Sequence, residues 1–416
     1  MILKIKLNEN DRKKVISLKF SVPEKCKKIT INKKILSSIN NGFKNKIDIS
    51  FFDSDNKWYG RFDRYKASFE ISDKNSTIGV VSSGIWKANF EVFQIYEEIE
   101  IELDIQFEIY NNYNIYKGEL HTHTNITDGK LDFSDLVEYI KKNEYDFFFI
   151  SDHNSITAWD QIKNLKKINC YKGLELTTFY GHILLLGVDR YVDWYKKNGA
   201  LKKIKSIKRE VESMNGLMGI AHPFTCGGPF CAGCRWEKSI DPEHFNFIEV
   251  WNSKAESYKN NWEAIDAWVE FLKKGIEIFC TCGGDIHRYG DLEVASKIHS
   301  LACQNKESMI LDSLRAGRFY LSKKSLVTLD INGKTFGEKL YSYSENIVKY
   351  KISDPADDLQ LFIISKEGMK KLDHQNKEII WNTENKKDFF VLMGINSQRQ
   401  LEFLTNPIFI EKRQKT

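Results

Sequence analysis

The sequence predicts an α/β fold in which a central run of parallel β/α units is flanked by two β-rich segments. Residues 1–115 alternate apolar and polar positions, residues 116–318 alternate short apolar strands with amphipathic helices, and residues 319–416 return to the first pattern. At 416 residues the chain also exceeds one comfortable core. We therefore expect three parts: a β-sandwich-like domain, an α/β domain and a β-rich C-terminal segment.

The first segment shows period-two alternation, as in Ile16–Phe20 and Ile99–Leu103, and no convincing helical period. Its first forty residues carry eleven Lys and Arg and three acidic residues, an excess larger than the +5 of the whole chain. Such a segment could face an anionic partner, but a solvated strand surface is the simpler interpretation.

The central segment contains three amphipathic helices. Ser134 is a candidate cap for the first, and the other two, over 201–214 and 262–272, end near Gly216 and Gly275. Their expected buried faces are Leu136, Val137 and Ile140, then Leu201, Ile204, Ile207, Val211 and Met214, then Trp262, Ile265, Val269 and Leu272. The strands expected between them are 146–151, 183–188, 217–221, 247–251 and 276–281.

The C-terminal segment begins after Arg318 and contains a two-residue hairpin signal at Asn332-Gly333. A further apolar strand is expected at Leu359–Ile364. The charged tail Glu411–Thr416 is expected to fray.

The composition narrows the cellular setting. The longest apolar stretches are far shorter than the ~20 residues that cross a bilayer, so no membrane span is expected. Residues 1–20 interleave Lys and Arg with apolar residues and lack the apolar run of a secretory signal, which predicts a cytoplasmic protein. The eight cysteines are accordingly expected to be thiols or ligands rather than disulfides.

Histidines and carboxylates recur at the ends of the expected strands. In His121-Thr-His123 the two imidazoles lie two residues apart, and in a strand such residues point to one side and can hold one ion. If the strands are parallel and form a barrel, the histidines and carboxylates that follow the later strands would lie at the same end of that barrel as His121 and His123. A single histidine is as often a hydrogen-bonded core or surface residue as a metal ligand. Histidines and carboxylates that recur at successive strand ends are much better explained as ligands. The candidate metal ligands are His121, His123, Asp128, His153, Glu175, His182, His222, Asp285 and His287.

This ligand set is nitrogen and carboxylate oxygen, which suits Zn, Mn or Fe and not a thiolate-rich structural zinc. Carboxylates can bridge ions ~3.5–4 Å apart, so two or three divalent ions are expected, with a metal-bound hydroxide as the attacking group. The sequence has no Gly-x-Ser-x-Gly elbow, phosphate-cradling Gly-rich loop or dinucleotide fingerprint. These observations predict a metal-dependent hydrolase.

The nine residues resemble, in order and spacing, the motifs of the PHP family (polymerase and histidinol phosphatase domain) over about 116–290. The resemblance implies a distorted (β/α)7 barrel with up to three metals. It also implies three ligand groups: His121, His123, Glu175 and Asp285 for the first metal, Glu175, His182 and His222 for the second, and Asp128, His153 and His287 for the third.

Outer motifs look like the CehA/McbA-type branch of that family. They are Trp58-Tyr-Gly-Arg61, Gly84-Ile-Trp86, Ile248-Glu-Val-Trp-Asn252, Arg315-Ala-Gly-Arg318 with Phe319-Tyr-Leu-Ser322, and Thr405-Asn-Pro-Ile408. Members of this branch act on diverse esters, so the resemblance implies an ester substrate without fixing which one.

Two further features accompany the ligands. Cys226, Cys231 and Cys234 follow His222, and their spacing allows a small structural metal site, with His244 within reach, or a redox pair; reduced thiols in a loop are the simpler interpretation. Three basic residues near the ligands are candidate contacts for an anionic substrate, with surface solvation as the alternative. They are Lys130, Arg235 and Arg288.

The leading hypothesis is a phosphoesterase acting on a small anionic ester. A carboxylic or carbamic ester hydrolase with the same site is one alternative, and a non-catalytic metal-binding module is another. An oligonucleotide nuclease is not favoured, because it would need a basic stripe with stacking aromatics at the barrel mouth, whereas the basic residues concentrate at 1–40.

Overall fold

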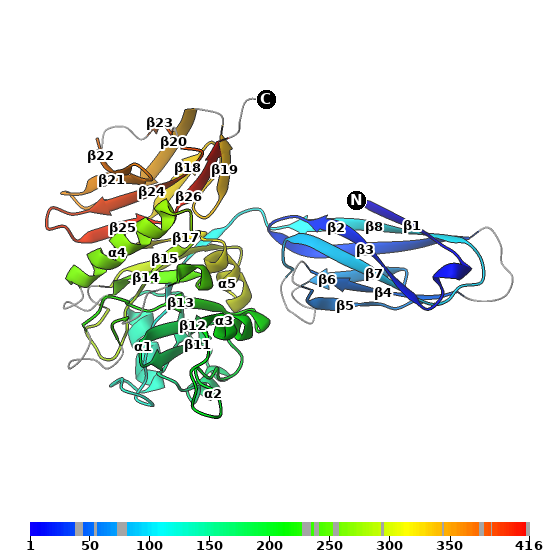
Figure 1. Cartoon of the computed structure of the whole chain (residues 1–416), viewed down its shortest axis with the longest axis horizontal. Helices are drawn as coiled ribbons and strands as arrows, with labels where there is room; N and C mark the ends of the chain where they lie inside the picture. The colour runs from blue at the N-terminus through cyan, green and yellow to red at the C-terminus, as the bar shows by residue number, and fades with distance from the viewer. Residues whose placement is uncertain are drawn as a thin grey trace. The chain divides into compact units, whose positions relative to one another are not determined.

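The structure is a computed structural model. It describes residues 1–37, 45–53, 56–72, 81–226, 234–236, 241–252, 258–292, 295–342, 345–373, 378–383 and 385–412. The chain divides into two compact units, Met1–Tyr113 and Asn114–Thr416 (Figure 1). Residues 319–416, expected as a separate segment, lie within the second unit.

The first unit consists of two four-stranded antiparallel sheets around one apolar core. Alternate residues of its strands are buried, as Ile99, Ile101, Leu103 and Ile105 are, because successive side chains of a strand point to opposite faces. One sheet has the order β1 (Ile2–Leu7), β8 (Ile99–Ile109), β3 (Cys26–Ser37) and β6 (Ser68–Ser72); the other has β2 (Lys14–Val22), β7 (Gly84–Gln94), β4 (Lys46–Phe52) and β5 (Trp58–Phe62).

The second unit is built on one large mixed sheet. Its strands follow the order β15-β14-β13-β12-β11-β10-β9-β16-β17-β25-β24-β21-β22. The strands nearest the candidate ligands are β9 (Asn114–Glu119), β10 (Phe147–Ile150), β11 (Asn169–Thr178), β12 (Gly181–Leu186), β13 (Leu217–Ile220), β14 (Phe247–Asn252) and β15 (Phe279–Gly283). They continue into β16 (Lys297–Ala302) and β17 (Phe319–Ser322).

The prediction of a wholly parallel set is wrong at β12. Pairs β9–β10, β10–β11, β13–β14 and β14–β15 are parallel, but β12 is antiparallel to both β11 and β13. Only Phe179 and Tyr180 connect β11 to β12, and a connection that short forces a hairpin. Gly181 follows with a φ of +150°, and a Cβ there would lie 2.5 Å from the ring of Trp236.

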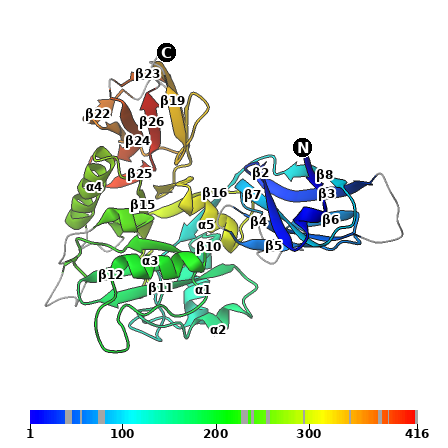
Figure 2. The same ribbon diagram turned by 45° about the vertical axis from the view of Figure 1, so that its right-hand side comes forward.

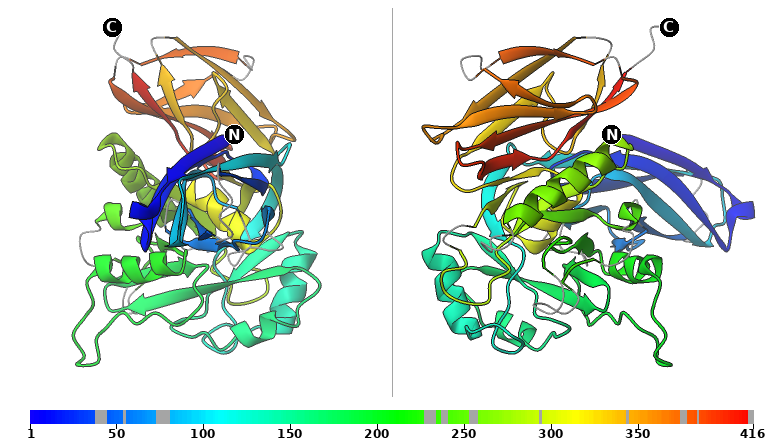
Figure 3. Two further views of the ribbon diagram at one scale, coloured as in Figure 1. Left: turned by 90° about the vertical axis from the view of Figure 1, so that its right-hand side faces the viewer. Right: turned by 60° about the vertical axis from the view of Figure 1, so that its left-hand side comes forward.

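Helices cover the strands of this unit, as Figures 2 and 3 show. They are α1 (Phe133–Lys142), α2 (Trp159–Ile162), α3 (Ile204–Ser213), α4 (Tyr258–Lys273) and α5 (Glu307–Arg315), with the 3-10 turn η2 (Pro242–His244); a second 3-10 turn, η1 (Glu9–Asp11), lies in the first unit. In the described part of the chain, no helix combines the length and apolarity that a bilayer crossing requires.

Three details of the predicted helices are corrected. Asp132, not Ser134, caps α1, since its carboxylate accepts a hydrogen bond from the Asp135 amide at 2.8 Å. Helix α3 begins at Ile204, and Leu201 instead forms a backbone bridge with Tyr195. In α4 the fully buried aromatic residue is Trp268, whose indole donates to Ile278 O at 2.9 Å, while Trp262 and Val269 are half-buried.

The C-terminal strands form a second apolar core within the unit. They are β18 (Val327–Ile331), β19 (Lys339–Ser342), β20 (Glu345–Ile352), β21 (Gln360–Ser365), β22 (Gly368–Leu372), β23 (Glu378–Asn382), β24 (Lys387–Ile395), β25 (Leu401–Thr405) and β26 (Ile408–Lys412). Asn332 and Gly333 make the predicted tight turn, with φ of +50° and +82°. The strand after that turn, however, pairs with β26, and β18 pairs with β20 instead.

Asn406 joins the C-terminal strands to the strands around the candidate ligands. Its buried side chain accepts a hydrogen bond from Cys280 N at 2.8 Å and donates to Phe319 O at 3.1 Å. This contact ties the segment after β25 to both β15 and β17.

The assignment of Asp132 as the cap of α1 predicts different effects on stability for substitutions at Asp132 and at Ser134. Replacing Asp132 with Ala should lower the free energy of unfolding by about 1 kcal/mol, because an amide of the first turn loses its acceptor. Replacing the exposed Ser134 with Ala should change it by less than about 0.5 kcal/mol. Urea unfolding, with hydrogen exchange of residues 133–142 as a local readout, measures both; a larger loss for Ser134→Ala would contradict the assignment.

His299 predicts a pH effect on stability. It is buried in β16 and stacks on Tyr320, with ring centroids 4.8 Å apart, and burial lowers its pKa to about 4. The unfolded chain takes up this proton near pH 6.5 and the folded chain only near pH 4, so stability is fully present above pH 6.5 and falls between those values. His299→Phe keeps a ring on Tyr320 but has no group to protonate, so its melting temperature should fall less than that of the wild type between pH 7 and pH 5. An equal fall in melting temperature for both proteins would refute the assignment.

Candidate metal centre

Backbone pairing beyond the strand ends brings the candidate ligands together. Thr122, after β9, forms a parallel bridge with Ile286, after β15; His123 N donates to Ile286 O at 2.9 Å, and Ile286 N donates to His121 O at 3.2 Å. A second bridge joins His153, after β10, to β11. The two ends of the strand series β9 to β15 therefore meet at the candidate site.

Glu175, a buried residue of β11, lies at the centre of this site. Its two carboxylate oxygens approach five imidazoles. Oε2 lies 3.2 Å from His121 Nε2, 3.4 Å from His123 Nε2 and 2.8 Å from His153 Nδ1, and Oε1 lies 2.9 Å from His182 Nδ1 and 3.2 Å from His222 Nε2. As expected from their spacing, His121 and His123 reach the same carboxylate from one side.

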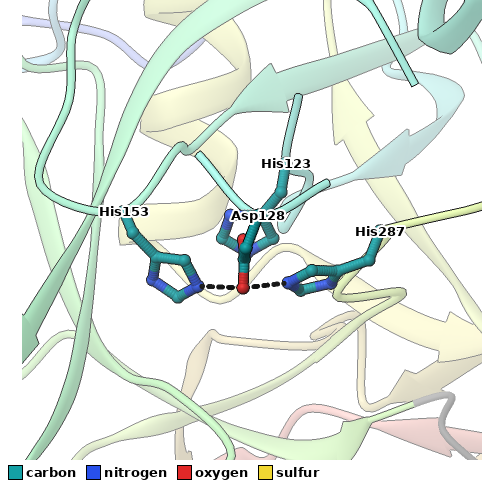
Figure 4. A group of neighbouring side chains, drawn as sticks. All are labelled: His123, Asp128, His153 and His287. Carbon is teal, nitrogen blue, oxygen red and sulfur yellow. Dashed lines mark ion pairs between the residues drawn. The ribbon is translucent and has the colours of Figure 1, made fainter. Parts of the chain in front are cut away.

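Asp128 and Asp285 extend the site away from Glu175. Asp285 Oδ1 lies 3.2 Å from His123 Nε2 and 3.4 Å from His287 Nδ1. Figure 4 shows Asp128 between the rings of His153 and His287, with Oδ2 at 3.5 Å and 3.2 Å from their Nε2 atoms. The Asp128 side chain is 58% exposed, whereas Glu175 is fully buried, so the site opens on the Asp128 side.

All nine predicted residues fall into four overlapping groups that could each hold an ion. Within a group, one ligand atom from every residue lies within 4.8 Å of the others. The groups are His121, His123 and Asp285; His121, Glu175 and His222; His153, Glu175 and His182; and His123, Asp128, His153 and His287. They differ from the grouping that the family resemblance implies, since His182 and His222 fall in separate groups and His123 also joins Asp128.

The buried donor atoms fit cations. Several have no hydrogen-bond partner among the described residues: His121 Nε2, both ring nitrogens of His123, Glu175 Oε2, His182 Nε2 and His222 Nδ1. Buried polar atoms without partners are costly, and such a concentration in one place is rare in a folded protein. Divalent ions between the rings would satisfy these atoms, and the nitrogen and oxygen donors suit Zn, Mn or Fe.

The electrostatics of the site follow from burial and charge. Burial opposes ionisation of Glu175, but His121, His182 and His153 hold its pKa well below the usual value. Burial lowers the pKa of His123 to about 3, so this imidazole is neutral and can act as a ligand. Burial also disfavours a charged His153, but Glu175 and Asp128 outweigh it and raise its pKa to about 10.

Two of the candidate ligands have positive φ angles, which are uncommon for residues other than Gly. His222 has a φ of +23°, and Asp285 has a φ of +46°, in the left-handed region that Asp tolerates better than most L-residues. Such conformations persist only where surrounding structure enforces them, and they are typical of functional sites.

Sequence reasoning missed several residues that contact the ligands. The buried Glu249 has Oε2 2.9 Å from His121 Nδ1, and the half-buried Thr177 has Oγ1 2.6 Å from His153 Nδ1. Glu119 accepts hydrogen bonds from the amides of His121 and Gly284, and Asp152 accepts from Thr124. Glu119, Asp152 and Glu249 stood within or beside the recognised motifs, but neither composition nor spacing indicates what a carboxylate contacts.

The proposed substrate contacts lie on the surface. Arg288 is 73% exposed and lies 3.6 Å from Asp291. Arg235 lies 3.7 Å from Glu263, and Lys130 is exposed. Their role in binding a substrate stays a prediction.

The cysteine loop differs from expectation. Cys234 is disulfide-bonded, so the prediction of thiols throughout is wrong at this position. Cys226 is a free exposed thiol, and Cys231 lies outside the described residues. His244, the suggested fourth ligand, instead lies 3.4 Å from Asp241.

Exposed aromatic side chains gather beyond the end of β11. Phe179 follows Thr177, which contacts His153, and its ring meets Trp194 edge to face at a centroid distance of 4.8 Å. Trp194 in turn meets Tyr195 at 5.3 Å. Phe179 is 68% exposed and Tyr195 44% exposed. The basic residues of the same loop, 189–203, are Arg190, Lys196, Lys197, Lys202 and Lys203.

The sequence matches no known family model and no curated protein. Among solved structures, the chain is similar to a two-domain protein from Bacteroides vulgatus containing a predicted PHP-like metal-dependent phosphoesterase, with 15% identity over 74% of this chain and 97% of that one and a TM-score of 0.43. It is also similar to a protein from Bifidobacterium adolescentis assigned as a metal-dependent phosphoesterase (13% identity, 42% and 88% covered, TM-score 0.31). It is similar as well to an amidohydrolase from Chromobacterium violaceum, with 12% identity over 43% of this chain and 90% of that one and a TM-score of 0.31. Likeness at this level leaves the activity of this chain open.

Proposed function

We propose that the chain is a metal-dependent hydrolase, and that its substrate is a small phosphate ester. The supporting observation is the buried set of imidazole and carboxylate atoms without hydrogen-bond partners around Glu175. Two or three divalent ions would be held by His121, His123, Asp128, His153, Glu175, His182, His222, Asp285 and His287. The fold that we propose around them is a distorted barrel formed by β9 to β15.

The chemistry of such a site divides between the ions and the chain. Divalent ions held there would acidify a water molecule toward a pKa of ~7 and neutralise negative charge on the ester. Glu175 and the buried imidazoles would exclude bulk water and fix the positions of the ions. Because His153 and His287 would be occupied as ligands, a water molecule on the open side beside the exposed Asp128 would pass a proton to the leaving group.

The substrate class rests on charge. Several divalent ions behind a partly exposed opening favour a dianionic phosphate over a neutral ester. Carboxylic or carbamic ester hydrolysis by the same site is the alternative that the resemblance to the CehA/McbA branch allows, and membership of that branch stays a prediction.

Metal removal tests this proposal. Chelation should abolish hydrolysis of p-nitrophenyl phosphate, and added Mn²⁺ or Zn²⁺ should restore it. Glu175→Gln should lower kcat/KM by at least about 100-fold, since even residues that only support ligands have effects of that size. His244→Gln, a histidine outside the set, is the matched control. Hydrolysis that survives both chelation and Glu175→Gln would contradict the proposal, and faster turnover of p-nitrophenyl acetate would favour the carboxylic ester alternative.

A second candidate substrate, a single-stranded oligonucleotide, is favoured by the aromatic loop. Phe179 lies two residues after Thr177, which contacts His153, and its ring packs against Trp194; the exposed Lys196 and Lys197 follow Tyr195. Aromatic faces with nearby basic residues are the features that bind single strands. The sequence predicts that the basic residues concentrate at 1–40, away from the ligands. Lys196 and Lys197 in loop 189–203 are basic residues that do not follow that expectation.

The aromatic loop can be tested separately from the metal site. Phe179→Ala or Trp194→Ala should raise KM for a short 5′-phosphorylated oligonucleotide by about 10-fold, since stacking contributes roughly 1–3 kcal/mol per base. Hydrolysis of glycerol phosphate should not change, because that substrate has no ring. Tyr341→Ala removes an exposed ring elsewhere and is the control. Equal effects on both substrates would exclude a stacking role.

A further inference from the structure

Glu249, which the proposed chemistry does not use, contacts a candidate ligand deep inside the second unit. Its side chain is 1% exposed, and Oε2 lies 2.9 Å from His121 Nδ1. A carboxylate accepts hydrogen bonds and donates none, so His121 Nδ1 carries the proton. Nε2 is therefore the His121 atom left to bind an ion, and it lies 3.2 Å from Glu175 Oε2 and 3.6 Å from Asp285 Oδ1.

Asn252, on the same strand, connects Glu249 to a second candidate ligand. Its Nδ2 donates to Glu249 Oε1 at 3.0 Å and lies 3.4 Å from Asp285 Oδ2. His121 and Asp285 belong to the same candidate ion group. The buried amide of Asn252 is therefore hydrogen-bonded both to the residue that orients His121 and to Asp285, two ligands that would share an ion.

A bulge in β14 makes this arrangement possible. Residues three apart on a regular strand point to opposite faces, so Glu249 and Asn252 should not reach the same site. The pairing of β14 with β15 shifts between Glu249 and Trp251, which leaves Val250 as an extra residue. Such bulges re-aim side chains beside active sites.

Helix α4 fixes the far end of the connection. Asn252 N donates to Asn261 Oδ1 at 3.0 Å, and Asn261 Nδ2 donates to Asn252 O at 2.8 Å. Asn261 is also buried. At the other end, Gly283 leaves room for the carboxylate, because a Cβ there would lie 3.2 Å from Glu249 Oε2.

We propose that Glu249 and Asn252 are positioning residues that select the tautomer of His121 and hold it in register with Asp285 at one ion position. The inference rests on the proposed metal site, but not on the identity of the substrate. Partners that orient ligating histidines commonly contribute 10–100-fold to metal affinity. The two groups without His121, which contain His182 or Asp128 and His287, should be affected less.

The test measures metal binding without catalysis. In Mn²⁺ titrations of the full chain followed by electron paramagnetic resonance and by chelator competition, Glu249→Gln should weaken binding at the positions that include His121 by about 10–100-fold and leave the others near wild-type affinity. Asn252→Ala should weaken the position that His121 shares with Asp285. Nitrogen-15 NMR of the Zn²⁺-loaded protein should show His121 protonated at Nδ1 in the wild type and a disturbed Nδ1 signal in Glu249→Gln.

Two controls separate this role from a general loss of structure. Glu243→Gln changes an exposed carboxylate in η2 and should alter nothing. Thr177→Val removes the contact to His153 and should weaken a different ion. Unchanged affinity and tautomer in Glu249→Gln, or equal weakening of every ion, would overturn the inference. Wild-type protein that binds Mn²⁺ but hydrolyses no ester would refute the proposed function and leave the inference standing, whereas no binding by the wild type would refute both.

Discussion

The carboxylate of Glu175 is the group on which the second unit depends. It is fully buried and surrounded by imidazoles, and a buried charge is tolerated only where opposite charges or ligands compensate it. Because the five imidazoles come from segments after β9, β10 and β13 and from β12, the strand arrangement must bring four stretches of chain to one point. The pairing of β9 to β15 in one mixed sheet brings these four stretches together around Glu175.

Departures from regular structure concentrate around that point. Strand β12 reverses direction after a two-residue turn, which places His182 opposite Thr177 beside Glu175. His222 and Asp285 have positive φ values, and β14 carries a bulge next to Glu249. Each irregularity costs stability locally, and each directs a side chain into the site. Regular strands with the same residues would aim some of these side chains elsewhere.

The site has a closed side and an open side. Glu175, Glu249 and Asn252 lie in the interior, where contacts to the backbone and to α4 keep them in place. Asp128 is mostly exposed, and the aromatic turn at Phe179 continues from the strand whose Thr177 contacts His153. This division suits the proposed hydrolase, in which fixed ligands would position the ions and the exposed rim would select the substrate.

The sequence by itself predicted the succession of a β-rich segment, a central α/β segment and a further β-rich segment, together with the nine candidate ligands, because period-two and helical patterns and strand-end histidines are local features of the chain; it missed helices α2 and α5. It also predicted that His121 and His123 share one side. Only the tertiary structure decided that β12 runs antiparallel, that Asp132 rather than Ser134 caps α1, and that Glu249 and Asn252 support His121 and Asp285. The first two outcomes turn on short local features, a two-residue connection and one side-chain hydrogen bond, and the third depends on residues far apart in the chain and on one extra residue in β14; none of these leaves a periodic signal in the sequence.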